Sequence, residues 1–537
     1  MAFRENLQHQ FSIFDHRNNL TEREKNVLEK SWAKVFADEI FPAIDETRFS
    51  ILYSDKASRP NTPVNIIVGA LIIKELFDLS DDEMVENLML DMHFQYALHT
   101  TDFIEQPLSD KTLSRFRKRC YDYERTTGID IFHNCICNLN NKIAKMMGIN
   151  SHIKRMDSLM IEANIKKMSR IELIYACTAN LAKKIYKSKK GINLGQLYHY
   201  CNPDDCNIVI YHSRNIDVND RTKLIIEEAD QLIGLCDTEL KESNEYKLLT
   251  RCLSEQTIIE NGSRRLLIKG KEPLAANSLQ NPSDSEATFR RKNNKQYIGY
   301  VANIVETVGE NGSVVTDYQY EINTYSDKHF LMDYLNNAEP QEENVQIVAD
   351  GGYSVQSIKE VAAAKNIEII NTALVGTPVP NIYAEFNIND DGDEVTSCPN
   401  GCHPVKCKYF KNADQIKAYF SVNDCKNCPY LSECTILIRK KTNLLAISRK
   451  AIERAKQQRK MTGNEFNNWQ RIRNGVESIP SILRNKFKVD KIPVRGKIPS
   501  KLYFGSKISA LNFRKLFRFR KGLSCHPYNP ILAKNAS

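Results

Sequence analysis

Short apolar runs that end at acidic residues constrain the fold of this chain most strongly. Val345–Ala349 is a mainly apolar run followed at once by Asp350, and Gly351-Gly352 permits a tight turn behind it. A run of this length between turn signals is typical of a buried strand rather than a helix. A second strand-like run, residues 152–161, has imperfect alternation and contains Asp157. The sequence therefore predicts a sheet with acids at or near its strand ends.

The order of the predicted elements indicates a mixed α/β sheet with a central hairpin. After residues 152–161 comes a long polar insertion with a helical pattern, and strand signals then return on both sides of the turn Gly309-Glu310-Asn311-Gly312, which contains the favoured Asn-Gly pair. The expected elements are strands 296–306 and 313–322, helix 327–337, strand 345–349, helix 354–365 and strand 367–370.

The length of 537 residues predicts several domains. We expect a helical N-terminal domain (1–150), an α/β core (151–370) with a helical insertion at about 168–280, a cysteine-rich insertion (371–445), and a final part (446–537) that combines a long helical pattern with a basic C-terminal segment. In the first domain, the apolar run Val64–Phe77 follows Pro63, and a later predicted helix carries Arg115 and Arg117. This pattern favours helical DNA binding, and a plain helical bundle is nearly as good an interpretation.

The charge distribution points to a phosphate-binding surface. The formal net charge is +9, but residues 439–521 contain 24 Lys and Arg against four acids, a net of +20, which leaves +9 − 20 = −11 for the rest. A block this basic is typical of nucleic-acid contact, and a solvated basic face is the alternative. Because no apolar stretch is long enough for a membrane span and the N-terminus has no apolar signal region, we expect a cytoplasmic protein.

Three acids are candidates for holding divalent cations. Strand ends are where α/β sheets build their sites, and carboxylates such as Asp157 and Asp350 suit Mg²⁺. Two ions can activate an attacking oxygen and stabilise a leaving oxygen at a phosphodiester. Glu477 shares a predicted helical face with Arg473 and Arg484. The alternatives are turn or cap roles for the two Asp residues and a surface ion-pair ladder around Glu477.

The cysteine-rich insertion has the spacing of a zinc site. The chain has 15 Cys, an odd number without a secretory signal, which disfavours a disulfide framework. Cys425-x2-Cys428 is a metal knuckle, and Cys434 with one of Cys398, Cys402 or Cys407 can complete a tetrahedral thiolate site. Reduced thiols without metal are the alternative.

Several motifs together resemble the DDE transposases of bacterial insertion sequences. They are Met156-Asp157-Ser158 through Asn164, Val348-Ala349-Asp350-Gly351-Gly352-Tyr353-Ser354, Arg473-Asn474-Gly475-Val476-Glu477-Ser478 with Pro493-Val494-Arg495-Gly496, Ala287-Thr288-Phe289-Arg290 with Tyr297-Ile298-Gly299-Tyr300, and the helical segment from about Arg59 to Arg119. In order and spacing they cover most of the chain. The resemblance implies an RNase H-like mixed sheet core and two Mg²⁺ or Mn²⁺ ions held by Asp157, Asp350 and Glu477.

The same resemblance implies partners and further site residues. DNA is the expected partner, as terminal inverted repeats and as target, and a homodimer or larger complex is expected on paired ends. Arg473 and Arg484 would hold phosphate, and Arg471, Arg495, Arg115 and Arg117 are further DNA-binding candidates. Cys398, in Cys398-Pro399-Asn400-Gly401, resembles the first cysteine knuckle of the family, so it is preferred beside Cys425, Cys428 and Cys434 for a structural Zn²⁺. The chain departs from the related Tyr-x2-Arg-x3-Glu-x6-Lys signature at Gln470 and Arg484.

Two other functions remain open at this point. A metal-dependent nuclease that cuts without joining would use the same three acids. A non-catalytic DNA-binding protein derived from a transposase would need only the basic segment and the cysteine knuckle.

Overall fold

The computed structural model describes residues 1–6, 15–54, 59–103, 105–150, 152–188, 192–212, 217–260, 262–268, 270–292, 294–353, 356–373, 378–461 and 464–523. Its contacts divide the chain into two compact units. Unit 1 is Met1–Tyr334 with Ser478–Pro527, and unit 2 is Leu335–Glu477 with Tyr528–Ser537.

Unit 1 begins with helices, as the sequence predicted. They are α1 (Glu22–Glu29), α2 (Trp32–Val35), α3 (Val64–Phe77), α4 (Asp81–Leu90), α5 (Met92–Ala97), α6 (Thr112–Thr127) and α7 (Ile131–Met146). Local chemistry fixes several starts: Thr21 and Ser80 each form a capping box with the Glu three residues later. The predicted helix Val64–Phe77 is confirmed with the same bounds, and nearly all of it is buried because it is apolar on every side.

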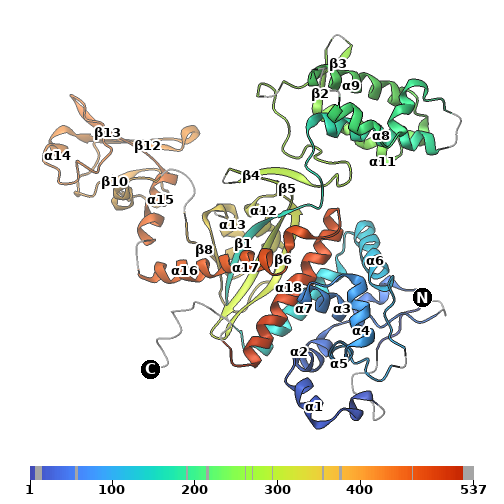
Figure 1. Ribbon diagram of the computed structural model, residues 1–537. Helices are drawn as coiled ribbons and strands as arrows, with labels where there is room; N and C mark the ends of the chain where they lie inside the picture. The colour runs from blue at the N-terminus through green and yellow to red at the C-terminus, as the bar shows by residue number, and fades with distance from the viewer. Residues whose placement is uncertain are drawn as a thin grey trace. The chain divides into compact units, whose positions relative to one another are not determined.

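The C-terminal helix of unit 1, α18 (Lys497–Arg520), is an interior element despite its basic sequence. It packs on α3, α7 and β6 (Figure 1) and buries most positions from Leu502 to Leu516. Lysines of α18 pair with acids of other elements: Lys497 with Glu321, Lys501 with Glu124 and Asp130, Lys507 with Glu75, and Lys515 with Glu306. Part of the +20 charge of the basic segment is therefore used inside the fold and is not offered to phosphate.

The sheet of unit 1 is built around the long strand β5 (Lys295–Gly309). It pairs antiparallel with β4 (Thr288–Lys292), with β1 (Ile153–Glu162) and with β6 (Gly312–Ile322). The predicted hairpin is confirmed, because β5 ends at Gly309 and β6 begins at Gly312. The register shifts once, between Val305 and Glu306, where Glu306 turns into the interior against Arg155 and Lys515.

The predicted helical insertion between β1 and β4 is also present. It contains α8 (Arg170–Lys187), α9 (Val218–Gly234), α10 (Thr238–Lys241) and α11 (Asn244–Gln256), which share a hydrophobic core. The sequence interpretation missed a small hairpin, β2 (Thr257–Glu260) with β3 (Ser263–Leu266), because its strands are short and rich in charge.

Unit 2 opens with a strand, a helix and a strand close to the predicted bounds. Two elements match their predicted ranges: helix α12 (Asp327–Asn337) and the strand that follows it, β7 (Val345–Ala349). Helix α13 (Gln356–Ala363) then connects β7 to the parallel strand β8 (Ile367–Asn371). Antiparallel pairs in unit 1 and a parallel pair in unit 2 confirm a mixed helix-and-sheet protein.

The rest of unit 2 is the cysteine-rich insertion and two helices. The insertion contains the strand pair β9 (Asn387–Ile388) and β10 (Val395–Ser397), the sheet β11 (Lys406–Phe410), β12 (Gln415–Ser421) and β13 (Thr442–Ser448), and helix α14 (Val422–Lys426). Helices α15 (Arg449–Lys460) and α16 (Asn464–Asn474) follow. The long helical pattern expected within 446–537 is present but interrupted, because it is divided into α15, α16, a 3-10 turn and α17 (Ser478–Asn485).

Candidate functional site

Asp350 lies directly after β7, as predicted, at the start of a tight turn. The next three residues, Gly351–Tyr353, form a 3-10 turn. The N–H of Gly352 donates to the Asp350 carboxylate at 2.6 Å, which fixes one oxygen against the turn. The side chain is still 41% exposed. Its second oxygen can therefore take another partner.

That partner is Arg473 on α16, which packs against β7. The Arg473 guanidinium lies 3.9 Å from the Asp350 carboxylate and also pairs with Glu477, four residues further on. The structure thus brings Asp350 and Glu477, which are distant in sequence, to one cation. Two carboxylates that approach one another repel, and the guanidinium between them offsets this repulsion.

The α-helical hydrogen-bonding pattern is interrupted just before Glu477. The helix α16 ends at Asn474, and Gly475–Glu477 form a 3-10 turn before α17 begins at Ser478. Pro480 then falls in the first turn of α17, where no backbone N–H is required. Glu477 sits at this break with its side chain 60% exposed.

Arg484 on α17 lies beside the strand that carries Asp157. Its guanidinium donates to the Met160 carbonyl at 2.8 Å and pairs with Asp490 at 3.2 Å. Asp490 in turn accepts the Glu162 N–H at 3.2 Å. Sequence reasoning assigned no role to Asp490, and its only signal was that it is one of the few acids in the basic segment.

Asp157 belongs to unit 1, whereas Asp350 and Glu477 belong to unit 2. It lies in the middle of β1, opposite Ile304 of β5, not at a strand end. Its carboxylate accepts the N–H of Ser158 at 2.9 Å and is partly exposed. The predicted strand 152–161 is confirmed within one residue at each end, but the expectation that Asp157 lies at or near a strand end was wrong.

The remaining arginine candidates differ in how free they are to meet DNA. Arg471 and Arg115 are exposed, and Arg495 is exposed while donating to the Asn164 carbonyl at 3.0 Å. Arg117 is different, because it pairs with Asp81 and its guanidinium lies 4.9 Å from the centre of the Tyr503 ring. Only 14% of its side chain is exposed, so its contacts hold α6 against α4 and α18.

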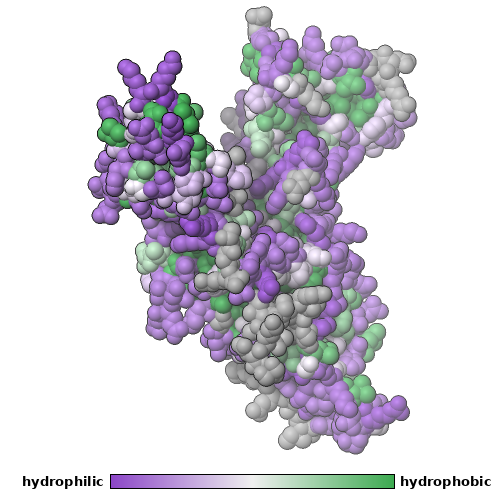
Figure 2. Space-filling model, turned by 90° about the vertical axis from the view of Figure 1, so that its left-hand side faces the viewer, coloured by the Kyte–Doolittle hydropathy of each residue, from purple (hydrophilic) through white to green (hydrophobic). Residues whose placement is uncertain are grey.

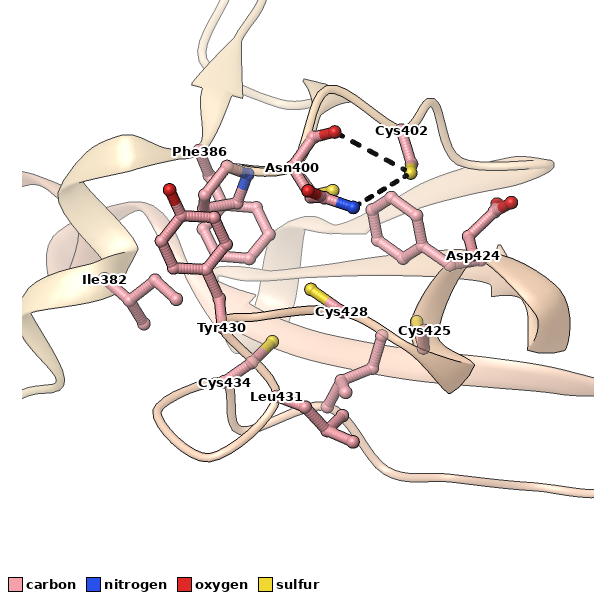
Figure 3. Close-up of a pocket in the computed structure, with 14 residues that line it drawn as sticks. Ile382, Phe386, Asn400, Cys402, Asp424, Cys425, Cys428, Tyr430, Leu431 and Cys434 are labelled. Atoms are coloured by element: carbon pink, nitrogen blue, oxygen red, sulfur yellow. Dashed lines mark hydrogen bonds between the residues drawn. The ribbon is translucent and has the colours of Figure 1, made fainter.

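Five cysteines line one small cavity in unit 2: Cys398, Cys402, Cys425, Cys428 and Cys434. The cavity is about 30 Å³ in volume, room for an ion or a water but not for an organic ligand. Figure 3 shows the sulfur atoms of Cys428 and Cys434 turned toward the same space. Burial raises the pKa of the Cys434 thiol, and the neighbouring thiols Cys425, Cys428 and Cys398 raise it further.

The other members of the cysteine-rich segment lie outside this cavity. Cys407 is on β11, and the ring of His403 bonds to the Thr396 carbonyl at 2.6 Å. Among the described residues, the one group of three or more His, Cys, Asp or Glu donors that lie within 4.8 Å of one another is elsewhere, at His133, Cys137 and Asp317. The cysteine sulfurs of the described residues thus line the same cavity, but no three of them lie within 4.8 Å of one another.

Comparison with protein families places two transposase regions on this chain. Residues 23–119 match a transposase domain (DUF772), and residues 397–517 match a transposase DDE domain. The second match covers the five cavity cysteines, Arg473, Glu477 and Arg484, whereas Asp157 and Asp350 lie before it. No curated protein and no solved structure matches the chain.

The two matched regions support the same class of protein. Both are transposase domains, so they support a DNA transposase function for the chain, with DNA as its partner. None of the helices in the described part of the chain is both long and apolar enough to cross a membrane. The face drawn in Figure 2 is mainly hydrophilic, with its apolar side chains in small separate groups.

Proposed function

We propose that this transposase cuts DNA at the ends of a mobile element and joins the freed ends to target DNA, with Asp157, Asp350 and Glu477 as its catalytic acids on an RNase H-like core. The observation that carries the proposal is the meeting of Asp350 and Glu477 at the guanidinium of Arg473. Asp157, on β1, would complete the set.

The acids have the chemistry of a divalent-cation site. Asp350 and Glu477 are oxygen donors that remain 41% and 60% exposed, and the side-chain partner that they share, Arg473, is a cation. Two Mg²⁺ or Mn²⁺ ions bound there would supply activation of the attacking oxygen and stabilisation of the leaving oxygen. The Gly352 N–H orients Asp350 for this task, because it holds one carboxylate oxygen and leaves the other available.

The arginines would hold the DNA backbone. A guanidinium binds carboxylate and phosphate with the same planar fork, so Arg473 can exchange a carboxylate for a phosphate when DNA arrives. Arg484, fixed by Met160 and Asp490, would place phosphate beside β1. Arg471, Arg495 and Arg115 would add contacts to the backbone, and Arg117 would act by holding α6 in position.

A structural Zn²⁺ in the cysteine cavity fits the same proposal. Cys425, Cys428, Cys434 and Cys398 give a four-thiolate set around the cavity, with Cys398 taken from its resemblance to the first cysteine knuckle of the family. Such an ion would stabilise an insertion with a small core. The helical N-terminal domain would read the terminal inverted repeats, two or more copies would act on paired ends, and the protein would work at the nucleoid.

The test is a cleavage and strand-transfer assay on DNA that carries the ends of the element, with Mg²⁺ or Mn²⁺. We expect Asp350→Ala to lose joined product by at least about 10²–10³-fold, the range for removing one preorganised electrostatic group. Glu368→Gln is the matched control, because this exposed acid on β8 contacts Gln346 and no arginine of the site.

Each result discriminates between the functions. Joined products that depend on Asp350 but not on Glu368 support the transposase. Cutting without joining by the wild-type protein would replace the proposal by a metal-dependent nuclease. Salt-sensitive DNA binding without any metal-dependent product, in folded protein, would replace it by a non-catalytic DNA-binding protein.

A further inference from the structure

A second group of metal-binding side chains lies far from the three acids in sequence. His133 and Cys137 are one helical turn apart on α7, and Asp317 is on β6, which packs against α7 (Figure 1). Nε2 of His133 lies 2.9 Å from Oδ1 of Asp317 and 3.3 Å from Sγ of Cys137, and that sulfur lies 3.2 Å from the same Oδ1. The three donor atoms form a closed triangle.

The triangle is not the arrangement of a cysteine nucleophile. A histidine that relays a proton needs one nitrogen for the nucleophile and the other for the orienting acid. Here the same nitrogen, Nε2, faces Cys137, Asp317 and also the Tyr318 carbonyl at 2.8 Å. One N–H cannot serve three acceptors well, whereas a cation in the triangle serves the sulfur, the nitrogen and the carboxylate together.

The distances between the three donor atoms suit a small divalent cation, such as Zn²⁺, that accepts nitrogen, oxygen and sulfur ligands. Bond lengths of about 2.0–2.1 Å to nitrogen, 2.0–2.2 Å to oxygen and 2.3 Å to sulfur place tetrahedral zinc ligands roughly 3.3–3.6 Å apart. The observed separations of 2.9, 3.2 and 3.3 Å are therefore shorter by only a few tenths of an ångström. A small outward rotation of the side chains would accommodate an ion.

The surroundings make the group accessible and well supported. The side chains of His133 and Asp317 are 25% and 30% exposed, so an ion can enter from solvent and water can take a remaining position. The Tyr318 ring packs edge-on against the His133 ring, with centroids 4.7 Å apart, and the Tyr318 N–H donates to Asp317 at 2.7 Å. Both contacts orient ligand side chains from outside the triangle.

We propose that His133, Cys137 and Asp317 bind one Zn²⁺ or a similar divalent transition-metal ion with nitrogen, sulfur and oxygen ligands. The ion would tie the last helix of the N-terminal helical region, α7, to the hairpin strand β6 of the sheet. This structural site is separate from the three acids and from the cysteine cavity, and it does not depend on the proposed reaction.

The test uses substitutions that keep the hydrogen bonds but weaken the ligands. Cys137→Ser and Asp317→Asn preserve size and polarity, so a merely hydrogen-bonded cluster would tolerate them. Cys135→Ser is the matched control, because Cys135 is a buried thiol on the same helix whose sulfur donates to the Asp45 carbonyl at 3.8 Å and is not part of the triangle. All are made in the full chain, with circular dichroism to establish folding.

Metal content and Co²⁺ titration are the first measurements. We expect Cys137→Ser to contain about one ion fewer per chain than the wild type and Cys135→Ser, and its Co²⁺ affinity to fall by more than the roughly 10–100-fold cost of losing an outer-shell partner. The thiolate-to-Co²⁺ absorption of this site should be lost, while that of the cysteine cavity remains. Equal metal content and equal Co²⁺ spectra in all folded variants would overturn the proposal.

Local hydrogen exchange gives a second, independent measurement. Added Zn²⁺ should slow exchange in α7 and β6 of the wild type and of Cys135→Ser, and should leave Asp317→Asn unchanged there. A Cys425→Ser/Cys428→Ser variant should retain the protection of α7, because its defect lies in unit 2. Protection of α7 and β6 that does not respond to Zn²⁺ in the wild type would refute the site.

Discussion

Helices α16 and α18 come from the same basic stretch of sequence, yet the fold uses their charges in opposite ways. In α18, Lys501, Lys507 and Lys515 point inward and pair with acids of other elements. In α16, Arg471 is exposed, and Arg473 stands between two acids that are themselves partly exposed. The net charge of a segment therefore does not tell which of its cations are available to a ligand, because that depends on where their partners fold.

The largest effect expected from this difference is on stability, at the buried end of α18. Glu306 is fully buried and bonds to Arg155 at 2.6 Å and to Lys515 at 2.8 Å. Glu306→Gln would leave two buried cations without a counter-charge and should lower the free energy of unfolding by about 3–5 kcal/mol in urea titrations. The control Glu321→Gln breaks the pair with Lys497, whose two side chains are 33% and 28% exposed, and should cost about 1 kcal/mol or less.

The same group gives a pH dependence with a definite sign. Burial raises the pKa of Glu306, but Arg155 and Lys515 outweigh it and lower the pKa to about 2. A depressed carboxyl pKa in the folded state adds stability above the unfolded value of about 4.3 and loses it as the pH falls toward 2. The free energy of unfolding of the wild type, measured by urea titration, should thus fall more steeply below about pH 4.3 than that of Glu306→Gln. Parallel curves would contradict the assignment.

The second prediction concerns activity, at Arg473. Arg473→Ala should lower DNA cleavage by about 10²-fold, because it removes the positive group shared by Asp350 and Glu477. Its effect on unfolding should stay within about 1 kcal/mol, since both partners are partly exposed. Lys515→Met in α18 should show the opposite pattern: its free energy of unfolding should fall, whereas its cleavage activity per folded molecule should equal that of the wild type. Loss of stability in Arg473→Ala without loss of cleavage would remove the contrast between the two helices.

The sequence predicted the parts of the fold whose signals are local. Helix α12 and strand β7 have the predicted bounds, because turn residues and apolar runs mark both ends of each within a few residues. The position of Asp157 within β1 depends on pairing with β5, which no local pattern contains.

Interactions between distant residues set the limit of sequence reasoning. The pairing of Lys507 with Glu75 and that of His133 with Asp317 join positions 432 and 184 residues apart. Composition shows that these cations and donors exist, but only the packing of α18 on α3, and of α7 on β6, selects their partners. The acids Asp350 and Glu477 were named from motifs, whereas their shared contact with Arg473 required the folded chain.

The smallest expected effect is on the salt dependence of DNA binding, and it separates exposed cations from internal ones directly. Each phosphate neutralised contributes about 0.9 to the slope of log affinity against log salt concentration. Arg471→Gln should therefore reduce that slope by about 0.9 if the exposed Arg471 meets a phosphate. The double variant Glu75→Gln/Lys507→Met removes a buried pair and should leave the slope unchanged, because Lys507 already has its counter-charge within the protein. Equal slopes for Arg471→Gln and the wild type would mean that exposure alone does not identify the DNA-facing surface of α16. A reduced slope in the double variant would instead show that the interior pairs of α18 are exchanged for phosphate on binding.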